Sequence, residues 1–258
     1  MLRFTISGRS KKNDEPVLDY LARGFPGIPL KYIDSVFGFV ERSPLYGGRI
    51  FEGAELIPPD VDALYGAGIG VRIPFTNHFA EPHEYAESAP VFEKYHRDGN
   101  AVIVTNDALA RWVRRDYPRY RIEASVIKNL RTYDKIAQAL DLYDTAVLPM
   151  DLCEDEAFLA GLPDKSRITL FANAACALTC PSKICYRSIS KFNKDGVSEL
   201  LCSGHMKARE FRGMVDFDLQ RLVDLGFSRF KVLRPVRFGP QEVRTPAKGD
   251  AARFSMAD

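Results

Sequence analysis

The chain has 258 residues and a formal net charge of +2, and 46% of its residues are hydrophobic and 27% charged. This length and composition suit one large globular core, and the balanced charge excludes a strong overall attraction to nucleic acid or membrane surfaces while leaving a nucleic-acid partner open. No apolar run approaches the ~18 residues that span a bilayer, and the first residues have the pattern of a strand rather than of a signal peptide, so we expect a cytoplasmic protein without membrane insertion.

Segments with the pattern of strands alternate with segments of helical period along the chain. In chain order, strands are expected at 3–7, 33–40, 68–75, 101–105, 120–126, 145–148, 168–172 and 229–233. Helices are expected at 16–23, 61–65, 82–97, 107–116, 132–140, 155–160 and 215–225. Eight strands alternating with helices predict the α/β class and a TIM-like (β/α)8 barrel. We therefore expect a single-domain barrel at 1–240 and a flexible C-terminal tail at 241–258.

Four of the five cysteines follow the seventh expected strand within 27 positions, with gaps of three, four and sixteen residues. They are Cys176, Cys180, Cys185 and Cys202, in a predicted loop at 173–202. Thiolates gathered in this way suit a soft metal or an iron–sulfur cluster, although each could also be a small core residue. The spacing lacks the short paired motifs of zinc ribbons, so it favours a [4Fe–4S] cluster, with zinc as the alternative. Cys153 stands apart and is expected to be buried.

In a barrel of this kind, the working face lies beyond the carboxyl ends of the strands. Asn77 and His78 follow the third expected strand, and Asn173 and Arg234 follow the seventh and eighth. We predict that these four residues bind substrate, although His78 could equally be a loop histidine held by the backbone. Asp151 follows the sixth strand and is a candidate catalytic residue.

Glu123 falls inside the fifth expected strand. A carboxylate that points into the barrel is costly unless it is paired, and Arg72 or Arg121 would be its natural partner. The residue could therefore be a structural ion pair or a catalytic acid or base.

Asn173 and the run CALTCPSKIC at 176–185 resemble the Asn-x-x-Cys-x-x-x-Cys-Pro element of the collagenase-like peptidase family, peptidase family U thirty-two. The stretches IDSVFGF at 33–39, TAVLPMDL at 145–152 and GFSRFKVLRP at 226–235 are also similar to it. Its members include anaerobic ubiquinone-hydroxylation proteins and a tRNA uridine hydroxylase. The resemblance implies a TIM-like barrel whose four clustered cysteines hold a [4Fe–4S] cluster. It also implies an oxygen-independent hydroxylation, or a related redox modification, of a small organic or nucleoside substrate.

Two other functions remain open at this stage. The chain could be a non-catalytic, cluster-bearing subunit that works with a second barrel subunit. It could also be a peptidase or other hydrolase that uses Glu123 or Asp151 without a metal, although the sequence contains no HExxH motif.

Overall fold

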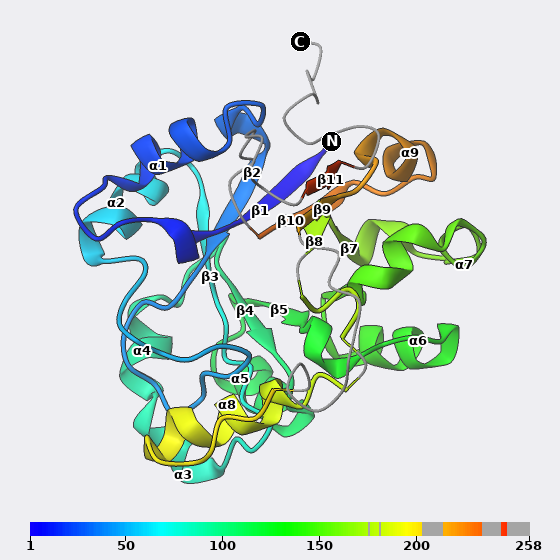
Figure 1. Cartoon of the computed structure of the whole chain (residues 1–258). Coiled ribbons are helices and arrows are strands. Elements are labelled where there is room, and N and C mark those ends of the chain that lie inside the picture. Colours follow the sequence, from blue (N-terminus) through cyan, green and yellow to red (C-terminus); the bar gives the residue numbers. More distant parts are fainter. Residues whose placement is uncertain (175, 181, 203–213, 234–243, 247–258) are drawn as a thin grey trace.

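The computed structural model describes residues 1–174, 176–180, 182–202, 214–233 and 244–246. Eight parallel strands close into a barrel in the order β1-β10-β7-β6-β5-β4-β3-β2 (Figure 1). They are β1 (Arg3–Ser7), β2 (Ile33–Phe37), β3 (Gly70–Ile73), β4 (Ala101–Val104), β5 (Arg121–Ala124), β6 (Thr145–Val147), β7 (Ile168–Phe171) and β10 (Arg229–Val232). The predicted (β/α)8 barrel is therefore confirmed, and each of its strands lies within a segment expected to be one.

Helices connect the strands and lie around the outside of the barrel (Figure 1). They are α1 (Val17–Gly24), α2 (Pro58–Gly66), α3 (Pro82–Glu87), α4 (Ala89–Lys94), α5 (Asp107–Asp116), α6 (Tyr133–Leu142), α7 (Glu156–Ala160) and α9 (Leu219–Asp224). The helix expected at 82–97 is divided at Ser88, because the ring of Pro90 cannot continue the preceding helical turn. Among the described helices, none has the length and apolar character needed to cross a bilayer.

Two further features differ from the sequence-based expectation. The predicted loop at 173–202 contains the helix α8 (Cys185–Asp195), and the first part of the helix expected at 215–225 is the strand β9 (Met214–Asp216). Strand β9 is antiparallel to β8 (Asn173–Ala174), and the amide of Phe217 donates to the carbonyl of Ala172 at 2.9 Å. Pairing with a distant strand thus overrides the local helical pattern.

The segment expected to be a tail contains the short strand β11 (Arg244–Pro246), which runs parallel to β9. The other residues of 241–258 lie outside the described part of the chain. Together β8, β9 and β11 form a second, three-stranded sheet that continues from the carboxyl end of β7.

The two faces of the barrel strands differ in chemistry. Alternate residues of a strand point to opposite faces, and one set packs between the strands and the surrounding helices. This set is apolar and almost fully buried, and it includes Phe4, Ile6, Val36, Val71, Ile73, Val102, Val104, Ile122, Leu170, Phe230 and Val232. These side chains form the main hydrophobic core.

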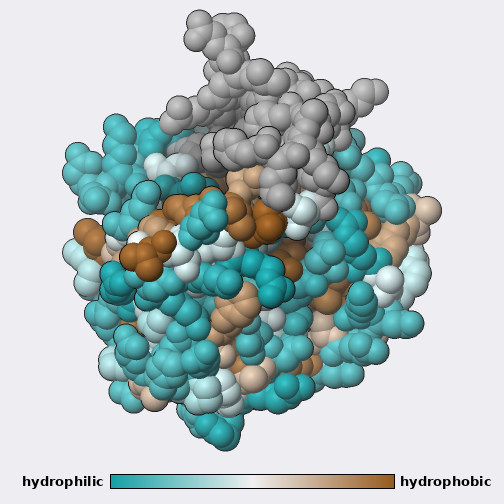
Figure 2. Space-filling view, turned by 60° about the horizontal axis from the view of Figure 1, so that its bottom comes forward, coloured by the Kyte–Doolittle hydropathy of each residue, from teal (hydrophilic) through white to brown (hydrophobic). Residues whose placement is uncertain are grey.

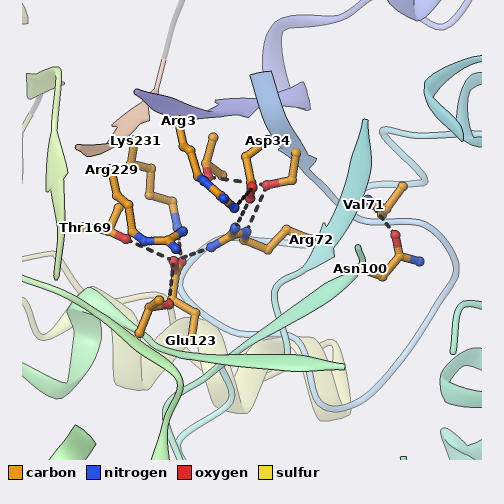
Figure 3. Close-up of polar contacts among 12 residues, drawn as sticks. Arg3, Asp34, Val71, Arg72, Asn100, Glu123, Thr169, Arg229 and Lys231 are labelled. Atoms are coloured by element: carbon orange, nitrogen blue, oxygen red, sulfur yellow. Dashed lines mark hydrogen bonds and ion pairs between the residues drawn. The ribbon is translucent and has the colours of Figure 1, made fainter. Parts of the chain in front are cut away.

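The other face carries a polar network that lies inside the barrel (Figure 3). Glu123 is 1% exposed and accepts an ion-paired hydrogen bond from Arg72 and a second one from Lys231 at 3.3 Å. The hydroxyls of Thr145 and Thr169 lie 3.5 and 3.4 Å from the same carboxylate. The predicted pairing of Glu123 with Arg72 is therefore present.

Arg72 extends this network to the strands on the other side of the barrel. Its Nη2 lies 2.8 Å from Asp34, and its Nε donates to the hydroxyl of Ser35 at 3.0 Å. The hydroxyl of Ser35 lies 3.3 Å from that of Thr5. The connected side chains come from β1, β2, β3, β5, β6, β7 and β10, so the network joins every barrel strand except β4.

Burial alone would raise the pKa of Glu123, but the positive charges of Arg72 and Lys231 outweigh it and hold the pKa below its usual range. Glu123 is therefore an anion near neutral pH.

Glu123→Gln should lower the free energy of unfolding by about 3–5 kcal/mol, because it leaves buried Arg72 and Lys231 without their anion. Urea denaturation measures the change. The matched control is Glu87→Gln, which removes an exposed carboxylate on α3 and should change stability by less than about 0.5 kcal/mol. Equal stability of the two variants would contradict the structural role of Glu123.

The same carboxylate predicts a dependence of stability on pH. A group whose pKa is lowered by folding contributes fully above its unfolded pKa, about 4.3 for Glu, and loses its contribution as the pH falls through its folded pKa. The difference in the free energy of unfolding between wild type and Glu123→Gln should therefore be constant between about pH 5 and about pH 7, a range above the unfolded pKa. It should shrink at lower pH. A difference that grows on acidification would contradict the lowered pKa.

Candidate functional site

The cysteine segment is defined as residues 173–202, and its described residues lie across the mouth of the barrel at the carboxyl ends of the strands. It starts directly after β7 and continues into α8, which contacts residues that follow β2 and β3. In the closed strand order, β3 is four strands away from β7 in either direction, so the two strands are opposite each other. The segment therefore spans the end of the barrel where the active sites of TIM barrels lie.

Asn77 fixes α8 to the loop after β3. Its Nδ2 donates to the carbonyl of Ser190 on α8 at 2.8 Å, and to those of Pro44 and Tyr46 at 2.9 and 3.2 Å. Its Oδ1 accepts the amide of Phe79 at 2.9 Å. Asn77 is fully buried, and all these contacts are within the protein. Its side chain therefore connects α8 to the loops after β2 and β3 and is not accessible to a substrate.

The end of α8 is held in the same way. The Nδ2 of Asn193 donates to the carbonyl of Arg49 at 2.9 Å, and its Oδ1 accepts the amide of Phe51 at 3.0 Å. Lys194 pairs with the buried carboxylate of Glu84 at 2.8 Å. The cysteine segment is thus attached to the barrel at β7, where it starts, and through α8 to the residues beyond β2 and β3.

Cys185 lies within electrostatic reach of the three other clustered cysteines. Burial raises the pKa of the Cys185 thiol, and the charges of Cys180, Cys176 and Cys202 raise it further. The sulfur of Cys180 accepts the amide of Lys183 at 3.3 Å, while Cys176 and Cys202 are exposed. Within the described ranges, no three His, Cys, Asp or Glu side chains form a ready-made metal site. The donor set fits a soft metal, and binding would require the sulfurs to move closer together.

A charged group on the rim lies next to these thiols. Asp151, which follows β6, forms a bidentate ion pair with Arg131, with N–O distances of 2.6 and 2.8 Å. Burial would raise the pKa of Asp151, but Arg131 and, less strongly, Lys183 lower it overall. The charge of Lys183 in turn interacts with those of Asp151 and Cys180. Asp151 is therefore held as an anionic partner of cations near the thiols, which suits a proton acceptor less well than an electrostatic role.

His78 lies at the same mouth and is half-buried. The hydroxyl of Ser190 donates to the carbonyl of Tyr186 at 2.8 Å, so it can only accept from the Nδ1 of His78, 3.2 Å away. This hydrogen-bond pattern assigns the proton to Nδ1 and leaves the lone pair on Nε2. Burial, with the charge of Arg187, lowers the pKa of His78, so the ring is neutral near pH 7.

The contact between Ser190 and His78 has the composition of a nucleophile and its base, but its geometry opposes that function. Ser190 is fully buried, and its proton is already committed to Tyr186. This pair therefore does not provide the exposed nucleophile that a serine hydrolase needs.

The remaining predicted residues are placed as follows. Asn173 is fully buried, and its Oδ1 accepts the amide of Leu233 at 2.9 Å, which joins β8 to the end of β10. Glu123 lies in the polar network inside the barrel, and Arg234 lies outside the described residues. Cys153 is fully buried, as expected, and burial raises its pKa to about 12.

Neither α8 nor the role of Arg131 was predicted from the sequence. A signal for α8 exists, since Tyr186, Ile189 and Phe192 recur at three-residue intervals and Gly196 follows in the left-handed conformation that ends helices. No comparable local signal marks Arg131, because its partner Asp151 lies twenty residues away, after the neighbouring strand β6.

No family model matches the chain, and no curated protein matches it. A comparison with solved structures finds similarity to the U32 peptidase Mk0906, with a TM-score of 0.62 and 15% sequence identity over 93% of this chain and 95% of that chain. At this identity, the similarity shows the fold alone: the chain is a single closed barrel that shares the architecture of a U32 peptidase over nearly its whole length.

Proposed function

We propose that the protein is an iron–sulfur protein that binds a [4Fe–4S] cluster through Cys176, Cys180, Cys185 and Cys202. We further propose that it catalyses or supports an oxygen-independent hydroxylation, or a related redox modification, of a small organic or nucleoside substrate. The observation that carries the proposal is the gathering of four cysteines on a segment that starts at the carboxyl end of β7 and crosses the barrel mouth. Within it, Cys176, Cys180 and Cys202 lie close enough to Cys185 for their charges to raise its pKa. Four thiolates are a usual ligand set for such a cluster.

The surroundings of the thiols support an anionic centre. A cluster held by four thiolates carries negative charge, and Lys183 lies close enough to Cys180 for their charges to interact. The charge of Arg131 also acts on Lys183, but Asp151 balances it, so Lys183 carries the compensating charge. When bound, the cluster would supply electron transfer at this mouth.

The protein's own residues offer a polar group to a substrate at the same place. His78 is neutral and presents Nε2 as a hydrogen-bond acceptor, while Ser190 holds its other nitrogen. A substrate hydroxyl or amide could donate to Nε2, and the ring could take up a proton there. Asn77 and Asn173 would contribute indirectly, Asn173 by holding the start of the cysteine segment and Asn77 by holding α8 within it.

A second candidate function is that of a cluster-bearing subunit without its own catalytic activity. It is favoured by the apolar side chains of Val197, Leu200 and Leu201, which are 84%, 44% and 38% exposed beside Cys202. Hydrophobic patches interrupt an otherwise largely hydrophilic surface on the face drawn in Figure 2. A second barrel subunit that covers these side chains would copurify with the protein and be needed for turnover.

Protein purified without oxygen should contain about four irons and four sulfides per chain and show the broad visible absorbance of thiolate-to-iron charge transfer. Replacing Cys176, Cys180, Cys185 and Cys202 together by serine should remove the iron and the absorbance. The matched control is Cys153→Ala, which removes the buried cysteine outside the segment and should retain both. Zinc in place of iron, or full activity of the fourfold variant on a hydrolase substrate, would contradict the proposal.

The grouping of the thiols can be tested without any metal. In the apo protein, Cys185 should react with iodoacetamide only at a pH above that of an ordinary thiol, because burial and the three neighbouring thiolates raise its pKa. Replacing Cys176, Cys180 and Cys202 by serine should shift the rate profile of Cys185 to lower pH, as followed by mass spectrometry. An unchanged profile would mean that the four cysteines are not neighbours in solution.

A further inference from the structure

The opposite end of the barrel, at the amino ends of the strands, contains a cavity of about 230 Å³. Its lining comes from the starts of β1 and β2, the ends of the turns before β3 and β4, and the first residue of β5. The residues are Met1, Leu2, Arg3, Lys31, Tyr32, Ile33, Asp34, Gly68, Gly70, Gly99 and Arg121. This cavity is separate from the cysteine segment, because parallel strands place their two ends on opposite faces of the barrel.

Cations outnumber anions in and beside this cavity. Figure 3 draws several of them, namely Arg3, Arg72, Arg229 and Lys231, with the carboxylates of Asp34 and Glu123. The charges of four arginines act on Asp34, and Lys231 and Glu123 follow deeper in the barrel. The cations are Arg3, Arg72, Arg121, Arg229 and Lys231, and the carboxylates are Asp34 and Glu123. Five positive charges against two negative ones leave an excess of three, to which Lys31 in the lining adds another.

The arginines are also brought together against their mutual repulsion. Arg3 and Arg229 are direct partners in the pairing of β1 with β10, where like charges destabilise a sheet. Burial lowers the pKa of Arg229, Asp34 opposes this change, and Arg3, Arg72 and Arg121 lower the pKa further. Asp34 is already shared between Arg3 at 3.2 Å and Arg72 at 2.8 Å, so it cannot neutralise the whole group.

Arg121 is exposed at the entrance of the cavity. It influences Asp34 through its charge, and no hydrogen bond or ion pair joins its side chain to another residue in the described part of the chain. Its guanidinium donors are thus available to an anion that enters the cavity. The backbone beside them belongs to glycines, since a Cβ on Gly68 or Gly99 would meet nothing within 4 Å, so the opening is not narrowed by side chains there.

We infer that this cavity is a binding site for a small tetrahedral oxyanion, namely phosphate or the phosphoryl group of a small ligand, with Arg121 and Arg3 as its outer donors. The forked guanidinium geometry matches phosphate oxygens. The cavity is smaller than the pockets of about 300–1,000 Å³ that enclose drug-sized ligands, which favours a compact anion over a whole nucleotide. The inference is independent of the proposed cluster.

Isothermal titration calorimetry with inorganic phosphate tests the inference on the full chain, at an ionic strength held constant with sodium chloride. The wild type should bind about one phosphate per chain, and Arg121→Gln should weaken binding by about ten-fold or more, because a hydrogen-bonded charge pair is lost. Arg111→Gln removes an exposed arginine on α5 that does not line the cavity, and it should bind phosphate like the wild type.

Since Arg121 makes no side-chain hydrogen bond to a described residue, Arg121→Gln should keep the wild-type circular dichroism spectrum and melting temperature. A second titration with glycerol 3-phosphate distinguishes the two sources of the anion: binding assigns the site to the phosphoryl end of a larger ligand, and a lack of binding assigns it to free phosphate. Absence of phosphate binding by the wild type, or equal binding by wild type and Arg121→Gln, would overturn the inference.

Discussion

The buried carboxylate of Glu123 is the constraint on which the barrel interior depends. TIM barrels usually fill their interior with branched apolar side chains, whereas here Arg72 and Lys231 point inward and require a buried anion between them. The hydroxyls of Thr145 and Thr169 complete the surroundings of that anion. A shift of one strand by one residue would move its inward side chain to the apolar outer face, so the network specifies the register as well as the charge balance.

This interior separates two ends of the barrel that differ in chemistry. At the carboxyl end, the cysteine segment spans the mouth from β7 to the residues after β3, and cations on the rim lie beside its thiols. At the amino end, arginines surround a small cavity and exceed the carboxylates in number. Arg72 takes part in both the interior network and the arginine group, so the stability of the barrel and the charge of the amino end are connected through it.

The strands and most helices could be predicted because their determinants are local. The apolar run at 101–104 is buried on both sides as β4, and Asn106 caps α5 through the amides of Ala108 and Leu109. The pairing of Glu123 with Arg72 was predictable for a similar reason, since an inward carboxylate requires a cation. What the sequence did not reveal depends on contacts between distant segments: β9 forms because β8 is available to pair, and α8 is a polar helix stabilised by Asn77 and Asn193.

The roles of the predicted site residues were harder to anticipate than their positions. Asn77 and Asn173 do lie at the carboxyl ends of strands, but burial and backbone partners make both of them structural.

Diffraction data collected at the iron absorption edge, from crystals grown without oxygen, test the central claim about the cysteine segment most directly. The account predicts one strong anomalous peak at the carboxyl mouth, within bonding distance of the sulfurs of Cys176, Cys180, Cys185 and Cys202. A map without that peak, or with the four sulfurs dispersed, would contradict it.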